Sequence, residues 1–174
     1  MRRAFSGAIL IEGDPRSSAT LTAALAGCDG AISALGSKVS PFRQVTLLST
    51  ATAALVEAMG KHGVTRLVCI TGLGAGDSRG HGGFLFDRLI MPLLLRNVYV
   101  DKDRQEAIIT GSKLDWTLVR PAVLTNKPAT GKVWAQVDLA EVHGGTITRG
   151  DVARFVVAGL SRGDWKKQAP LIRN

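Results

Sequence analysis

The feature that most constrains this chain is a repeated alternation of short apolar runs with longer helical segments. Residues 66–71 begin with an arginine and continue as an almost entirely apolar run. Such a run is typical of a parallel strand covered by helices on both faces. Similar runs occupy residues 8–11, 30–36 and 116–120. Because such alternation folds through right-handed crossovers, we predict an α/β fold with a doubly wound, mainly parallel sheet.

Capping and turn residues give the bounds of the other elements. We predict helices over residues 17–27, 41–62, 84–95, 101–111 and 151–160. Gly63 ends the second helix, a break near Asn97 separates the third from the fourth, and Asp151 caps the last. We predict short strands over residues 133–139 and 145–148 and an edge strand over residues 170–172, with Pro121 ending the strand over residues 116–120. The 174 residues suit one domain spanning residues 1–174.

The net charge of +8 would favour anionic partners, such as a nucleotide phosphate, a nucleic acid or an acidic membrane surface. The basic residues are nevertheless scattered, which also suits a solvated surface, and no aromatic interleaving supports nucleic-acid binding. No stretch approaches the roughly 18 apolar residues of a membrane span. Cys28 and Cys69 stand in apolar runs, so we expect small buried side chains, no metal site and a cytoplasmic protein.

Residues 72–83 form a glycine-rich loop after the strand at residues 66–71, at the edge of the sheet where α/β proteins bind ligands. Polar side chains in this loop suggest a lid or anion site over a substrate, although a mobile surface loop is the plain alternative. We assign Arg79 to an anionic group and His81 to proton donation. The candidate substrate-loop residues are Gly74, Asp77, Arg79 and His81.

Five segments carry a resemblance to a known family: residues 12–14, 27–36, 71–75, 102–106 and 114–121. Together they resemble the atypical, NmrA-like NAD(P)H-binding branch of the short-chain dehydrogenase/reductases, which includes biliverdin reductase B and flavin reductase. The resemblance implies a Rossmann-like fold and NADP or NAD as the cofactor. The family opens with a G-x-x-G-x-x-G turn that cradles the pyrophosphate, and this sequence has no such turn. We therefore expect an N-terminally truncated Rossmann-like sheet whose exposed edges a homo-oligomer would cover.

By resemblance, Asp14 lies near the adenine, and Ala34, Leu35 and Gly36 lie against the adenosine and diphosphate. Asp14 could instead only turn the chain, and Gly36 only permit a tight turn. The nicotinamide end is assigned to Thr71, Lys102, Pro121 and Val123.

Reduction on this fold uses a hydroxyl near the substrate carbonyl, a tyrosine that supplies a proton and a lysine that binds ribose. Thr71, Tyr99 and Lys102 are the candidates, with His81 as a further proton donor. Tyr99 could also be a packing residue, and Lys102 could pair with Glu106 one helical turn away.

The resemblance implies an NAD(P)H-dependent oxidoreductase that transfers hydride to a small carbonyl, quinone or flavin-type acceptor. The alternative is a non-catalytic dinucleotide-sensing or protein-binding module of the same family.

Overall fold

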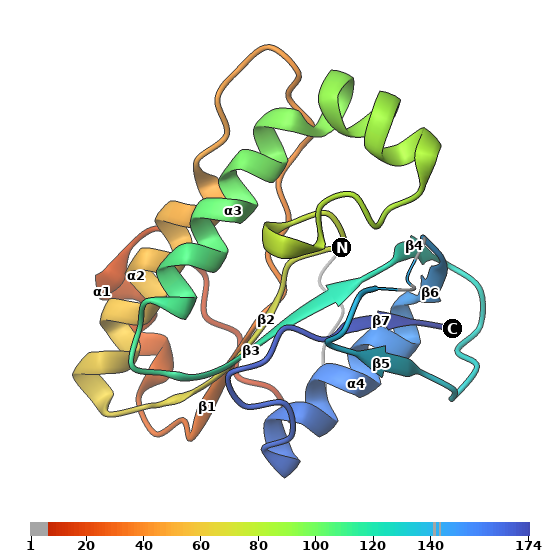
Figure 1. Ribbon diagram of the computed structural model, residues 1–174. Helices are drawn as coiled ribbons and strands as arrows, with labels where there is room; N and C mark the ends of the chain where they lie inside the picture. Colours follow the sequence, from red (N-terminus) through yellow and green to blue (C-terminus); the bar gives the residue numbers. More distant parts are fainter. Residues whose placement is uncertain (1–6, 141, 143) are drawn as a thin grey trace.

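A computed structural model describes residues 7–140, 142 and 144–174 and shows a sheet covered by helices on both faces (Figure 1). The sheet order is β1-β2-β3-β7-β5, with all neighbouring strands parallel except the antiparallel pair of β7 and β5. The strands are β1 (Gly30–Ser33), β2 (Arg66–Ile70), β3 (Asp115–Pro121), β7 (Leu171–Arg173) and β5 (Trp134–Gln136). A second, two-stranded parallel sheet joins β4 (Val123–Thr125) and β6 (Thr146–Thr148).

Three helices line one face of the large sheet and one helix covers the other. The first face carries α1 (Ser18–Leu25), α2 (Leu47–His62) and α3 (Arg96–Thr110), and α4 (Arg149–Arg162) lies on the second. A short turn, η1 (Gly76–Ser78), and a wide π-helical segment, η2 (Phe86–Leu95), precede α3.

Strand β2 shows why the sequence specifies this layering. Leu67 and Cys69 pack with Met59 and Ile109 from α2 and α3, whereas Val68 between them packs with Val156 from α4. Because successive side chains of a strand point to opposite faces, an uninterrupted apolar run buries both faces of the sheet. The predicted α/β fold with a mainly parallel sheet is confirmed.

The helix ends follow local rules. Gly63 ends α2 with φ of 66°, a left-handed conformation that glycine adopts without steric cost, as predicted. The cap of α4 is Thr148, whose hydroxyl accepts from the backbone N–H of Asp151, so the prediction that Asp151 itself is the cap was wrong. Asp151 lies in the first turn of α4, and its carboxylate accepts a hydrogen bond from the Thr148 hydroxyl.

Four further predictions need correction. Residues 8–11 form no strand, because no described strand pairs with them and Ile9 and Leu10 remain 91% and 77% exposed. Strand β7 is interior to the sheet, not an edge. The break near Asn97 is absent, since η2 runs directly into α3 at Arg96. Cys28 is exposed, whereas Cys69 is buried as expected.

Candidate functional site

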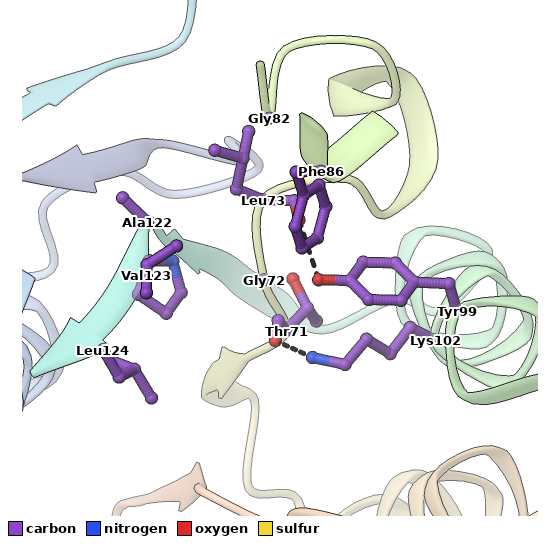
Figure 2. A pocket seen from close by; sticks show the side chains of 11 residues that line it. Thr71, Gly72, Leu73, Gly82, Phe86, Tyr99, Lys102, Ala122, Val123 and Leu124 are labelled. Carbon is purple, nitrogen blue, oxygen red and sulfur yellow. Dashed lines mark hydrogen bonds between the residues drawn. The ribbon is translucent and has the colours of Figure 1, made fainter. Parts of the chain in front are cut away.

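A pocket of about 270 Å³ opens at the carboxyl ends of β2 and β3 (Figure 2). Parallel strands end at one edge of the sheet, so the loops that follow β2 and β3 meet there with α3. Its lining residues are Thr71, Gly72, Leu73, Gly82, Phe86, Tyr99, Lys102, Pro121, Ala122, Val123 and Leu124. One wall carries the polar groups of α3, and the facing wall, from Pro121 onward, is apolar.

Tyr99 is held rigidly beside this pocket. Its hydroxyl donates to the Leu73 carbonyl oxygen at 2.9 Å, and its ring packs edge-on against Phe86 with centroids 6.1 Å apart. Burial raises the pKa of Tyr99 to about 12, and the carboxylates of Asp87 and Asp103 add to the effect. Tyr99 therefore keeps its proton at neutral pH.

Lys102 lies one helical turn after Tyr99 and points to the same place (Figure 2). Its ammonium donates to the Thr71 carbonyl oxygen and lies 5.4 Å from the centre of the Tyr99 ring. Burial lowers the pKa of Lys102. A Cβ atom at Gly72 would lie 3.0 Å from Lys102 Nζ and 3.5 Å from Tyr99 Oη, so glycine leaves the approach to both groups open.

The raised pKa of Tyr99 can be measured directly because it is the only tyrosine of the chain. We expect absorbance at 295 nm to show a phenol titrating near pH 12 in the folded protein. In urea the same phenol should titrate near pH 10. Since the unfolded state loses this proton first, stability should fall as the pH rises from about 10 towards 12. A folded-state midpoint near pH 10 would contradict the buried placement of Tyr99.

A buried ion pair that the sequence pattern did not predict lies directly behind the pocket. Arg120 donates from Nε to Glu106 Oε1 at 3.1 Å and from Nη2 to Oε2 at 2.6 Å. The Thr71 hydroxyl donates to the same Oε1 at 2.7 Å, and the exposed Asp77 pairs with Arg120 Nη1 at 2.5 Å. Glu106 is thus bound to Arg120 and Thr71, which leaves Lys102 directed at the pocket. An arginine inside an otherwise apolar strand was the available sequence signal for such a pair.

Gly76 allows the glycine-rich loop to close over this ion pair. With φ of 56°, a Cβ atom there would lie 2.5 Å from Glu106 Oε2 and 2.7 Å from Arg120 Nη2. We expect Gly76→Ala to lower the free energy of unfolding by roughly 2 kcal/mol more than Gly80→Ala. Gly80 is the matched control because its φ is also positive, at 90°, but nothing lies within 4 Å of its Cβ position. Equal losses in urea denaturation would contradict crowding at Gly76.

The structure brings five of the predicted residues to the pocket wall: Thr71, Tyr99, Lys102, Pro121 and Val123. It places the predicted adenosine-binding residues elsewhere along the same edge of the sheet. Ala34 and Leu35 line a separate apolar pocket beside β1, and Gly36 is exposed outside it. The Asp14 carboxylate accepts hydrogen bonds from the backbone N–H and from the guanidinium of Arg16. These bonds correspond to the alternative in which Asp14 only turns the chain.

The predicted substrate-loop residues do not line this pocket. His81 Nδ1 lies 3.2 Å from the Val142 carbonyl oxygen, and Arg79 pairs with Asp103. The backbone N–H of Gly74 donates to the Ser78 hydroxyl at 2.9 Å, which fixes the turn after β2.

Two findings concern the wider molecule. Among the described residues, no group of three or more His, Cys, Asp or Glu side chains is placed to hold a metal ion. Within the same part of the chain, no helix combines the length and apolar character needed to cross a membrane.

Comparison with known proteins identifies the family to which this chain belongs. A family model described as NAD(P)H-binding matches residues 3–162. The chain belongs to this NAD(P)H-binding family. Among curated proteins, the uncharacterized sugar epimerase YhfK of Bacillus subtilis (strain 168) is 33% identical over 161 residues, covering 91% of this chain and 68% of YhfK.

Several solved structures share the fold of this chain. ChuY, an anaerobillin reductase from Escherichia coli O157:H7, superposes with a TM-score of 0.78 at 21% identity, over 94% of this chain and 73% of ChuY. A short-chain dehydrogenase/reductase from Veillonella parvula DSM 2008 in complex with NADP gives 0.75 at 17% identity, over 94% and 71%. The predicted resemblance to atypical short-chain dehydrogenase/reductases is confirmed.

Proposed function

We propose that this NAD(P)H-binding protein is an oxidoreductase that transfers hydride to a small carbonyl, quinone or flavin-type acceptor in the pocket at Tyr99. The observation that carries the proposal is the convergence of Tyr99 Oη and Lys102 Nζ on one wall of that pocket, opposite an apolar wall. A proton donor facing an apolar surface suits a flat, reducible acceptor stacked against a nicotinamide. The anaerobillin reductase activity named for ChuY is consistent with this chemistry.

The residues at the carboxyl edge of the sheet fit the nicotinamide end of NADP or NAD. Lys102 would bind the ribose hydroxyls, and the backbone of Pro121 and Val123 would face the carboxamide. A glycine at position 72 suits such a site, because a side chain there would obstruct the approach of the ribose to Lys102 Nζ. Ala34 and Leu35 would lie towards the adenosine, since β1 is parallel to β2 and ends at the same edge.

The bound cofactor would supply the hydride. Tyr99 would hold a proton at Oη and give it to the acceptor atom that gains negative charge, the oxygen of a carbonyl or quinone or a ring nitrogen of a flavin. Water from the pocket mouth would then return a proton to Tyr99. Thr71 acts as a positioning residue, because its hydroxyl donates to Glu106 while its carbonyl oxygen accepts a hydrogen bond from the Lys102 ammonium. The Glu106–Arg120 pair fixes that arrangement from behind the site.

One observation favours a second candidate, a dinucleotide-binding module without turnover. Tyr99 Oη already donates to the Leu73 carbonyl oxygen and Lys102 Nζ to the Thr71 carbonyl oxygen, so bound ligands must displace at least one of these bonds.

The two candidates are separated by following NADPH oxidation at 340 nm with menadione, phenanthrenequinone and FMN as acceptors. The oxidoreductase proposal predicts oxidation that requires both protein and acceptor and that saturates with acceptor concentration. Saturable NADPH binding without turnover on any of the three would favour the dinucleotide-binding module.

A further inference from the structure

Exposed apolar side chains gather at one end of the molecule, on the segment around η2 and on the loop over residues 34–46 between β1 and α2 (Figure 1). The two segments meet because the Asn97 side-chain amide donates to the carbonyl oxygens of Ser40 at 3.0 Å and of Pro41 at 2.9 Å. The exposed apolar side chains of the two segments include Phe42, Phe84, Leu85, Leu89, Leu93 and Leu94. We call these six side chains, with the basic side chains among them, the η2 surface.

The register of η2 explains why its leucines face outward. Three apolar side chains of this segment pack with Tyr99, and they recur every four to five residues, as wide π-helical turns require. These inward-facing side chains are Phe86, Met91 and Leu95. Leu89 and Leu93 lie between them and remain 49% and 67% exposed, and Phe42 on the adjoining loop is 97% exposed. Large apolar side chains exposed together mark a surface that contacts a partner or a membrane.

The charges of the η2 surface are almost entirely positive. Its basic members are Lys38, Arg43, Arg88 and Arg96. All four are exposed, and no carboxylate of the described part of the chain forms an ion pair with them. Residues 34–46 contain no acidic side chain, and residues 84–96 contain only Asp87, whose Oδ1 is buried. This surface therefore concentrates part of the net charge of +8 around apolar side chains.

We propose that the η2 surface docks this protein on an anionic phospholipid membrane. Its apolar side chains would enter the boundary between headgroups and acyl chains, and its basic side chains would lie at the lipid phosphates. Charge complementarity favours this partner over a second copy of the chain, because a twofold contact would place the basic residues of one copy against the same residues of the other. A nucleic acid would match the charge but would leave the exposed leucines without a contact.

The charge is tested by sedimentation of the full chain with vesicles of phosphatidylcholine alone and of phosphatidylcholine and phosphatidylglycerol in equal parts. We expect saturable binding to the phosphatidylglycerol vesicles, weakened roughly 30-fold in Arg88→Gln/Arg96→Gln. The matched control is Arg154→Gln/Arg162→Gln, which removes two exposed arginines, also eight positions apart, from α4 on the other face of the sheet. The control should bind as the wild type does, and equal weakening in both double variants would reduce the effect to net charge and overturn the proposal.

The apolar contribution is tested with Phe42→Asn, which should weaken the same binding about tenfold or more. Val157→Asn is its control, because Val157 is 56% exposed on α4, and this variant should leave the binding unchanged. Unchanged binding in Phe42→Asn would contradict insertion of the η2 surface.

Two measurements on the wild type need no variant to fold. Binding to phosphatidylglycerol vesicles should weaken as the salt concentration rises, because the basic residues contribute to it. Absence of binding to these vesicles at low salt would overturn the proposal, and so would a dimer in solution that Phe42→Asn dissociates, since a second copy would then occupy the surface. Vesicle binding is measured without cofactor or turnover, so its outcome is independent of the proposed hydride transfer.

Discussion

Tyr99→Phe is expected to lower kcat for acceptor reduction by about 100-fold or more, the usual contribution of a positioned general acid. The substitution removes the proton donor but keeps the ring that packs on Phe86 and lines the pocket. It also removes the bond to the Leu73 carbonyl oxygen, a loss of about 1 kcal/mol in stability. The measurement is NADPH oxidation at 340 nm under saturating acceptor.

Cofactor affinity supplies the control for this variant. Tyr99→Phe should leave the Kd for NADPH unchanged, because Tyr99 is assigned to the acceptor and Lys102 to the ribose. An unchanged kcat would remove Tyr99 from the chemistry, and a weakened NADPH affinity with unchanged kcat would assign it to cofactor binding.

Arg120→Met is expected to lower the free energy of unfolding by roughly 3–5 kcal/mol. The methionine fills much of the same volume but leaves the Glu106 carboxylate buried without its charged partner, which is the costly outcome for a buried ion pair. Urea denaturation followed by circular dichroism measures the change.

The double variant Glu106→Gln/Arg120→Met separates the charge from the packing. A neutral amide can still accept the Thr71 hydroxyl, so the double variant should recover most of the stability lost in Arg120→Met. If both variants are equally unstable, the loss comes from packing around Arg120 and the charge pair is not the cause.

The sequence was informative where local pattern decides structure. The uninterrupted run at residues 66–71 specified a strand with two buried faces, and Gly63 specified the end of α2. The predicted break near Asn97 left the direction of Tyr99 relative to Lys102 open, whereas the continuous α3 places both residues, three positions apart, on one side of the helix.

What the sequence could not show depends on tertiary partners. Residues 8–11 have strand-like composition, yet a strand exists only when another pairs with it, and among the described strands none does. The partner of Arg120 could not be predicted either, because Glu106 is 14 positions away in the sequence. The spacing of Glu106 and Lys102 on one helix also allowed those two residues to pair with each other. His81 and Arg79 were placed in the site by proximity in sequence, whereas the loop turns them to Val142 and Asp103.

The central claim is that the residues around Lys102 hold a nicotinamide dinucleotide, and calorimetric titration of the full chain with NADPH and NADH tests it most directly. We expect one saturable site with Kd near micromolar, about −8 kcal/mol, and roughly tenfold weaker binding in Lys102→Met. No heat of binding up to millimolar NADPH or NADH, or the same affinity in Lys102→Met, would contradict it.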